Sequence, residues 1–264
     1  MKKCYVLLLT TLVCSIIPSY TYAQILFGPK VGYQTSWIRY APLYDGSDYT
    51  EGLMFSPQLG AIYGFSVSKA LSFYSELYYT QRAKREATTD VTTLLRRHSA
   101  KYHFLEVPLM LRVERRLGKS KEAPFIYANA GPQVSLWLAG SGELQSLETF
   151  GSTNWRRTEY KVGFSNNQSQ EGGIYAENAN RLQFGLSAGS GVMIPMNKRG
   201  QILQLDFRYS YSSTFMGSDL DLEIADTGVE ENFSFGHSFI SASVAYAFYI
   251  DIWGLRKGKS VRRK

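Results

Sequence analysis

Hydrophobic and polar residues alternate along most of the chain after residue 23, in segments long enough to cross a membrane as tilted strands. Eight segments show this pattern and are rich in Tyr, Phe, Val and Leu: 27–39, 54–67, 71–81, 102–114, 124–138, 181–195, 201–212 and 237–250. Alternation with a period of two predicts strands with one apolar and one polar face. About ten residues in this form span a bilayer. The pattern therefore predicts eight membrane-spanning β-strands.

The two faces of these segments differ in their chemistry. In residues 71–81, Leu71, Phe73 and Leu77 share one face, while Tyr74 and Glu76 lie on the other. An apolar face suits lipid and a polar face suits the interior of a barrel. Eight strands enclose a lumen that side chains fill, so we expect no open channel. Because buried charges need partners, we predict a polar network inside the barrel, formed by Lys30, Glu76, Glu106, Arg112, Asp206 and Arg208.

The connections between these segments alternate between short and long. Short connections span 68–70, 117–123 and 196–200, and long connections span 40–52, 82–101, 139–180 and 213–236. Outer-membrane barrels have short periplasmic turns and longer external loops. We predict an all-β fold, an eight-stranded antiparallel transmembrane β-barrel with short periplasmic turns and four long external loops. A soluble periplasmic β-barrel binding protein is the alternative, and the outward aliphatic faces argue against it.

Aromatic residues end several strands on the lipid-facing side, as the girdles of membrane barrels require. Trp37, Tyr79 and Tyr211 occupy one rim, and Phe65 and Phe248 the other. Trp137 departs from this pattern, because simple alternation points it inward. Either a β-bulge turns this side chain outward or it plugs the mouth of the barrel.

The two ends of the chain differ from its middle. Residues 1–23 join a basic start, an apolar run and a small-residue junction, and predict a signal peptide cleaved after Ala23. Both cysteines lie within it. Residues 24–250 form the expected barrel, and residues 251–264 form a basic C-terminal tail. This tail is expected either to extend into the periplasm or to contact phospholipid headgroups or an acidic partner.

The net charge of +7 comes from these ends. Removing their eight basic residues and one acidic residue leaves 21 of each kind in residues 24–250. A neutral body gives no argument for nucleic acid as a partner.

Three motifs resemble one family of barrels. They are the segment HFLEVPLML from His103 to Leu111, the segment GPQVS from Gly131 to Ser135, and the Gly-rich strand from Gly185 to Gly191. Together they resemble the PorT-like outer-membrane β-barrel family of Bacteroidota, over nearly the whole mature chain. The resemblance implies a barrel in the outer membrane. The founding type is linked to type IX protein secretion, but membership in the broad family does not by itself imply that role.

Catalytic and metal-binding patterns are weak. The three histidines, His98, His103 and His237, are not spaced like a zinc site. A lipid-modifying barrel enzyme would need a histidine near a serine and a carboxylate at the outer rim. His98 and His237 are the candidate histidines, with Ser99 or Ser238 as the serine. Residues 219–230 partly resemble a calcium loop, but Ile224 replaces the required glycine and the stretch alternates like a hairpin. We therefore expect no cofactor, no metal and no catalytic site.

Two long loops carry residues suited to binding. The loop 82–101 is basic and is expected either to be a solvated loop or to contact lipopolysaccharide phosphates. Its basic residues are Arg82, Lys84, Arg85, Arg96 and Arg97. The loop 139–180 joins aromatic and arginine side chains, which dominate binding hot spots, in Trp155, Arg156, Arg157 and Tyr160. The sequence thus favours a non-enzymatic outer-membrane protein that binds, scaffolds or assists secretion, in contact with outer-membrane lipid, lipopolysaccharide and other envelope or secretion-system proteins.

Overall fold

The computed structural model describes residues 24–40, 49–51, 54–68, 70–88, 96–120, 122–147, 155–164, 173–175, 179–196, 200–217, 221–223 and 230–251. The predicted signal peptide and the tail beyond Asp251 lie outside these residues. The strands are β1 (Gln24–Tyr40), β2 (Tyr49–Glu51), β3 (Met54–Ser66), β4 (Leu71–Thr88), β5 (Arg96–Arg116), β6 (Phe125–Leu147), β7 (Trp155–Gly163), β8 (Gly173–Tyr175), β9 (Leu182–Pro195), β10 (Gln201–Ser212), β11 (Asp221–Glu223), β12 (Glu230–Asn232) and β13 (Phe235–Asp251).

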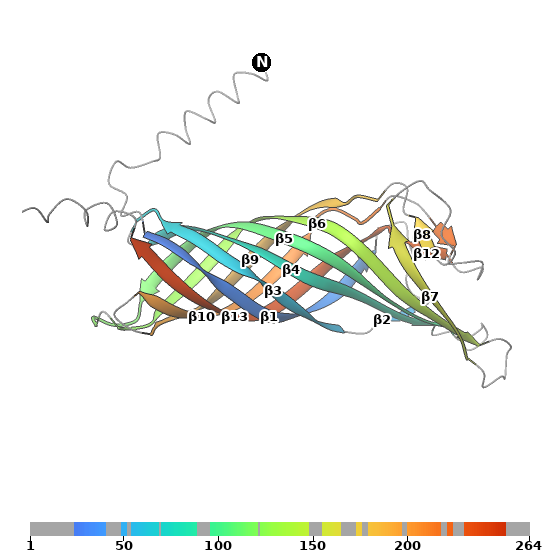
Figure 1. The fold of residues 1–264 in the computed structure, drawn as a ribbon, viewed down its shortest axis with the longest axis horizontal. Helices are drawn as coiled ribbons and strands as arrows, with labels where there is room; N and C mark the ends of the chain where they lie inside the picture. The colour runs from blue at the N-terminus through green and yellow to red at the C-terminus, as the bar shows by residue number, and fades with distance from the viewer. Residues whose placement is uncertain are drawn as a thin grey trace, which may run out of the picture.

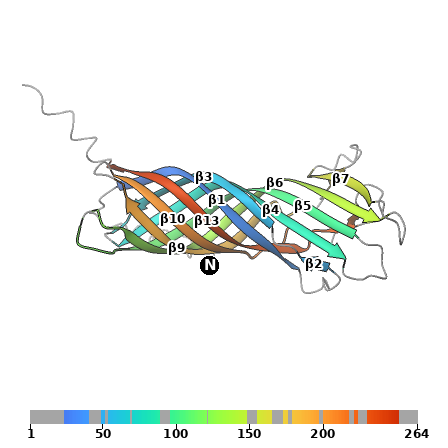
Figure 2. The same cartoon turned by 90° about the horizontal axis from the view of Figure 1, so that it is seen from below.

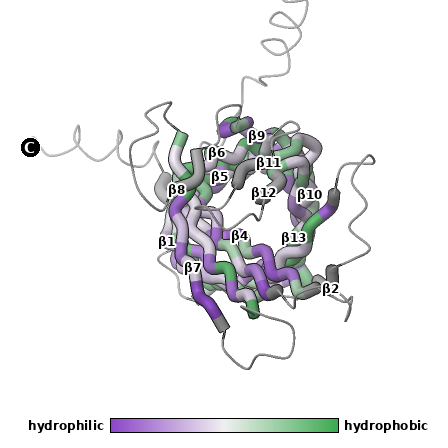
Figure 3. The backbone as a smooth tube through the Cα atoms, turned by 90° about the vertical axis from the view of Figure 1, so that its right-hand side faces the viewer, coloured by the Kyte–Doolittle hydropathy of each residue, from purple (hydrophilic) through white to green (hydrophobic). Residues whose placement is uncertain are grey.

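Eight of these strands close into a ring. Antiparallel pairing runs in the order β1, β3, β4, β5, β6, β9, β10 and β13, and β13 returns to β1. The strands tilt along a long cylinder and surround one axis when viewed from its end (Figures 1, 2 and 3). Each of the eight ring strands therefore has two antiparallel partners, as a barrel in lipid requires. The eight-stranded antiparallel barrel predicted from the sequence is confirmed.

The alternation of the sequence becomes an apolar outside and a polar inside. In β10, Leu205 and Phe207 are exposed, whereas the residues that alternate with them, Gln204, Asp206 and Arg208, are buried. The same holds in β5, where Leu109 and Leu111 face outward and Glu106 and Arg112 face inward. The outward apolar wall is the surface that hydrocarbon would cover.

The short and long connections gather at opposite ends of the barrel. The turns 67–70, 117–124 and 196–200 lie at the end where Gln24 pairs with Asp251, which we call the short-turn end. At Gly200 the backbone has a φ of 76°, a conformation that favours glycine, and the turn closes with the Met196 amide donating to the Gln201 carbonyl at 2.9 Å. The opposite end carries the long connections and is called the mouth.

Strands β4, β5 and β6 continue beyond the ring at the mouth. Residues 81–88, 96–103 and 139–147 of these strands pair with one another, and β7 pairs with β6 from Leu147↔Trp155 to Gly140↔Val162. We call this four-stranded part the extension sheet (Figure 1). The prediction of plain loops at 82–101 and 139–180 was therefore wrong in part. The alternation of hydropathy fades there, because the outer face is polar and the inner face is mixed.

A β-bulge lies at the base of the extension sheet, directly after Trp137. The register shifts between His103 and Phe104, so that Phe104 pairs with Trp137 and His103 pairs with Ala139. Leu138 is the extra residue, and Leu138 and Ala139 are both exposed. Trp137 points inward and is fully buried. It therefore plugs the mouth, which is one of the two orientations that the sequence left open.

The pairing between β3 and β4 ends at Gln58↔Thr80, although β3 continues along β1 to Met54. Pro57 is the next residue of β3, and proline has no N–H to donate to a ladder. Side chains of β1 then reach the freed edge of β4. The Gln34 side-chain amide donates to the Gln81 carbonyl at 2.9 Å, and the Ser36 hydroxyl lies 3.3 Å from both the amide N and the carbonyl O of Ala83. The wall stays sealed by hydrogen bonds at this point.

Candidate functional site in the barrel interior and mouth

A buried ion cluster fills the middle of the barrel. The Lys30 ammonium lies 2.7 Å from Glu76 Oε2 and 3.5 Å from Asp206 Oδ2. Arg208 donates to both carboxylate oxygens of Glu76 at 2.7 Å and to Asp206 Oδ2 at 2.9 Å. Four of the six residues predicted for the interior network therefore meet, from strands β1, β4 and β10. Each carboxylate faces two cations, which offsets the large cost of burying charge.

Glu106 organises a second cluster nearer the mouth. Arg82 donates to Glu106 Oε1 from Nε at 3.1 Å and from Nη2 at 2.8 Å. The Tyr78 hydroxyl and the Gln133 side-chain amide donate to Oε2 at 2.7 and 2.5 Å. Arg82 also donates to the Gln183 side chain at 3.0 Å. Both oxygens of Glu106 are thus occupied, as a buried carboxylate requires.

Arg112, the sixth predicted interior residue, lies between two aromatic rings. Its guanidinium carbon is 3.4 Å from the ring centre of Tyr74 and 4.0 Å from that of Tyr127. Nη1 donates to Gln204 Oε1 at 3.1 Å, whereas Nε and Nη2 have no partner among the described residues. Stacking on aromatic faces stabilises this cation where the hydrogen bonds do not.

Aromatic side chains close the mouth above the ion clusters. We call them the aromatic cap: Tyr102, Phe104, Trp137, Phe233 and Phe235, all 2% exposed or less. Trp137 meets Tyr102 edge-on at 5.7 Å between ring centres, and it lies tilted against Phe233 at 5.4 Å. Phe164, which follows β7, packs edge-on against Trp137 at 4.7 Å. Such edge contacts are favourable aromatic geometry. The cap and the ion clusters together occupy the lumen with buried side chains of the described strands.

Ser99 and Ser238 each follow their candidate histidine along the same strand, so the two side chains of each adjacent pair point to opposite faces. His237 lies among the Tyr102, Phe104 and Phe235 rings, and its ring nitrogens have no partner among the described residues. Ser238 is the next residue of the same strand and points to the opposite face. His98 instead contacts the Tyr160 hydroxyl at 2.6 Å. Among the described residues, His237 and Ser238 therefore do not form the rim pair considered for a lipid-modifying enzyme.

The five basic residues predicted to contact lipopolysaccharide are divided by the structure. Arg82 and Lys84 lie in β4 rather than in a loop, and their side chains point inward with 1% and 4% exposure. Their expected place on the external surface was wrong, because the strand continues past residue 81 and even positions face the interior. Arg85 and Arg97 are exposed on the outer face of the extension sheet. The side chain of Arg96 lies outside the described residues.

The four predicted loop residues also separate. Arg156 and Arg157 are exposed, and Arg157 pairs with Glu143 and Glu159, each at 2.9 Å. Tyr160 is buried against the aromatic cap. Its expected role in an exposed binding surface was wrong, because it lies on the inner face of β7. Trp155 begins β7, and its side chain lies outside the described residues.

The sequence interpretation missed the aromatic cap. Tyr102 and Phe104 follow the inward alternation of β5, so their burial was readable from the strand pattern. Phe233 and Phe235 come at the end of a long connection, and nothing local indicated that they would fold over the mouth.

Metal sites and spanning helices are absent from the described residues. They contain no group of three metal-ligating side chains, and no helix among them is long and apolar enough to cross a membrane. Much of the calcium-like stretch 219–230 lies outside them. Its described parts, β11 and β12, pair as a hairpin, which agrees with the alternation noted in the sequence.

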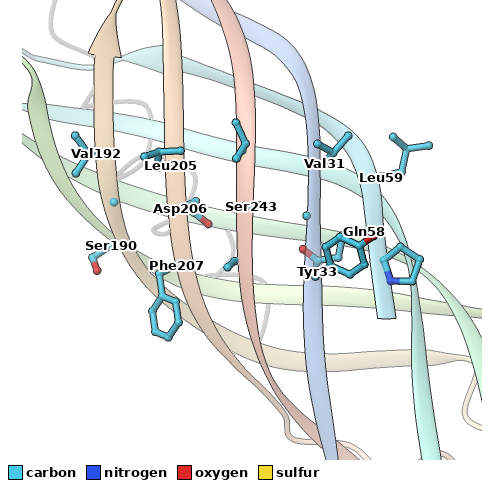
Figure 4. A pocket seen from close by; sticks show the side chains of 15 residues that line it. Val31, Tyr33, Gln58, Leu59, Ser190, Val192, Leu205, Asp206, Phe207 and Ser243 are labelled. Atoms are coloured by element: carbon cyan, nitrogen blue, oxygen red, sulfur yellow. The ribbon is translucent and has the colours of Figure 1, made fainter. Parts of the chain in front are cut away.

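The outer wall has a shallow hollow of about 900 Å³ over β1, β3, β9, β10 and β13. Val31, Leu59, Val192, Leu205 and Phe207 line it and point away from the lumen (Figure 4). Asp206 belongs to the same stretch, but its carboxylate turns inward to Arg208. The hollow is therefore part of the apolar wall, with no convergent polar groups for chemistry.

No family model and no curated protein matches the chain, so the PorT-like resemblance stays a prediction. Among solved structures, outer membrane protein OprG from Pseudomonas aeruginosa is 11% identical, with 88% of this chain and 97% of that chain covered and a TM-score of 0.47. Outer membrane protein AlkL in lipid bilayers is 9% identical, with 89% and 93% covered and a TM-score of 0.41. E. coli Outer Membrane Protein W is 14% identical, with 86% and 98% covered and a TM-score of 0.33. These low scores add no argument about function.

Proposed function

We propose that the chain is an integral outer-membrane β-barrel that acts without catalysis, as a binding or scaffolding protein or as an accessory of protein secretion. The apolar outer wall supports the membrane location. Its large apolar side chains include Phe55, Leu59 and Phe207, which are 75%, 63% and 56% exposed. Contiguous apolar surface of this kind marks contact with lipid or protein. The PorT-like motifs are the reason for including secretion among the roles.

The filled lumen is the observation that carries this proposal. Trp137, Arg82, Arg112 and Arg208 are among the largest fully buried side chains, and all of them point into the barrel. A lumen occupied by ion clusters and capped by aromatic rings offers no room for a solute. Specific contacts are therefore expected outside the lumen, where the extension sheet projects from the mouth.

Replacement of residues 143–177 by a short Gly-Ser linker tests this. The change removes the end of β6 from residue 143 onward together with all of β7 and β8, and leaves the pairing of the eight ring strands in place. We expect the shortened barrel to fold. When it is expressed in a deletion strain, it should fail to restore the wild-type set of secreted and surface-displayed proteins. The same linker in the turn 117–123, at the short-turn end, is the matched control and should restore them.

If the shortened protein fully restores these proteins, the extension sheet is not the binding site. The short-turn end and the basic C-terminal tail then become the candidates. A deletion strain with unchanged surface and secreted proteins would exclude the secretion role.

A further inference from the structure

Two lysines and a serine form one row across the outer face of the extension sheet. Ser141 of β6 is the register partner of both Lys101 in β5 and Lys161 in β7. Lys101 and Lys161 are exposed, and Ser141 between them is half-buried. Residues in register on neighbouring strands lie about 5 Å apart and point to the same face. The two ammonium groups can therefore converge over one hydroxyl group.

This row lies directly above the apolar wall. His103 lies two positions below Lys101 along β5. Its ring stacks on Tyr79 of the aromatic girdle and shares a hydrogen bond with the Tyr79 hydroxyl. Leu105 follows on the same face, and Leu138, which lies between the partners of Phe104 and His103, is exposed. Two residues of strand cover roughly 7 Å. The surface thus changes from hydrocarbon-facing to cationic within one or two such steps, as the chemistry of a lipid changes from acyl chain to phosphate.

The acidic residues of this face do not neutralise the row. On the outer face of the extension sheet, the described side chains include five basic residues, Arg85, Arg97, Lys101, Arg157 and Lys161, and two acidic ones, Glu143 and Glu159. Both acidic residues pair with Arg157, at 2.9 Å each. Positive charge therefore remains concentrated on the lower row, next to the apolar wall.

We propose that Lys101, Ser141 and Lys161 form a seat for the phosphate of a phosphorylated lipid in the leaflet at the mouth. The lysines supply the charge, the serine hydroxyl donates a hydrogen bond, and the wall around Leu105 and Leu138 holds the acyl chains. Ammonium groups bind phosphate through charge-assisted hydrogen bonds. This inference rests on the proposed membrane location. It places the lipid contact on residues other than those that the sequence indicated.

The test measures binding of diphosphoryl lipid A to the purified full-length barrel in detergent, by native mass spectrometry. Each lysine near a charged lipid surface contributes about fivefold to affinity, so Lys101→Gln with Lys161→Gln should weaken binding by roughly thirtyfold. Lys101→Arg with Lys161→Arg should keep most of it. Lys119→Gln removes the same charge from an exposed turn at the short-turn end, and should change nothing.

Three results would overturn the seat. They are equal binding by the double glutamine variant, equal binding of lipid A without its phosphates, and binding of inorganic phosphate as tight as that of lipid A. A heat-dependent shift on gels reports the folded barrel in every variant. Loss of the seat with a folded, membrane-inserted barrel therefore leaves the proposed function standing, whereas a soluble wild-type protein would remove both.

Discussion

At the scale of single residues, the interior is ordered by a small number of carboxylates that each serve several donors. Glu76 accepts from Lys30 and Arg208, and Glu106 accepts from Arg82, Tyr78 and Gln133. Breaking a buried pair by removing one partner costs about 3–5 kcal/mol, because the other charge stays buried without compensation. These contacts therefore constrain which strands can be neighbours.

Glu106→Gln tests this role. We expect the free energy of unfolding to fall by about 3–5 kcal/mol, since the Arg82 guanidinium loses its only carboxylate among the described ion pairs. Urea unfolding of the refolded barrel in lipid vesicles measures the change. Glu159→Gln, at a carboxylate with 71% side-chain exposure, is the control and should cost less than about 1 kcal/mol.

Removing both charges with Arg82→Met and Glu106→Gln together should cost less than Glu106→Gln alone, because no buried charge is left without a partner. An equal or larger loss in the double variant would contradict an electrostatic role for this pair.

At the scale of elements, one extra residue joins two parts of β6. Odd-numbered residues face the interior in the first part, and even-numbered residues face it in the second. Trp137 points inward below the bulge, and Gly140 and Leu144 point inward above it. An odd and an even position can share the inner face only if one residue is skipped between them. Leu138 is that residue, and it connects the ring part of β6 with the extension sheet.

Deletion of Leu138 is therefore expected to be tolerated. Trp137 would still pair with Phe104 and Ala139 with His103, so every side chain would keep its face. Deletion of Val134 is the matched comparison: it places Gln133 or Ser135 on the lipid side and should prevent folding. Heat-dependent mobility on gels and burial of Trp137, followed by fluorescence, distinguish the two. Failure of both deletions would mean that the bulge itself is needed for closure.

At the scale of the whole molecule, closure makes the barrel a single cooperative unit. Every ring strand has two partners, and the last strand pairs with the first from Gln24↔Asp251 to Tyr40↔Phe235. A closed ladder resists detergent, because no edge is available for unzipping.

The protein should therefore sediment with the outer membrane and run faster on detergent gels before boiling than after it. A chain carrying charges on the wall, Leu205→Lys with Leu111→Lys, is the control and should insert poorly, since each central lysine costs about 2–4 kcal/mol. Recovery of the wild-type chain in the soluble periplasm would contradict the membrane location.

The sequence by itself determined the ring. Period-two alternation is imposed by each strand on its own, so the eight segments, their faces and the interior residues Lys30, Glu76 and Asp206 could be predicted. Alternate short and long connections determined the strand order, because sequential hairpins pair neighbours.

Only the tertiary structure decided what happens at the mouth. Arg82 is buried and Tyr160 packs against the aromatic cap because β4, β5 and β6 continue beyond the ring and β7 pairs with them. Local hydropathy cannot report this, since these residues gain their burial from partners distant in sequence. Phe233 and Phe235 cap the lumen for the same reason. The surface that they cover exists only after β5 and β6 have paired, and a single bulge in that pairing sets which residues of the extension sheet face inward.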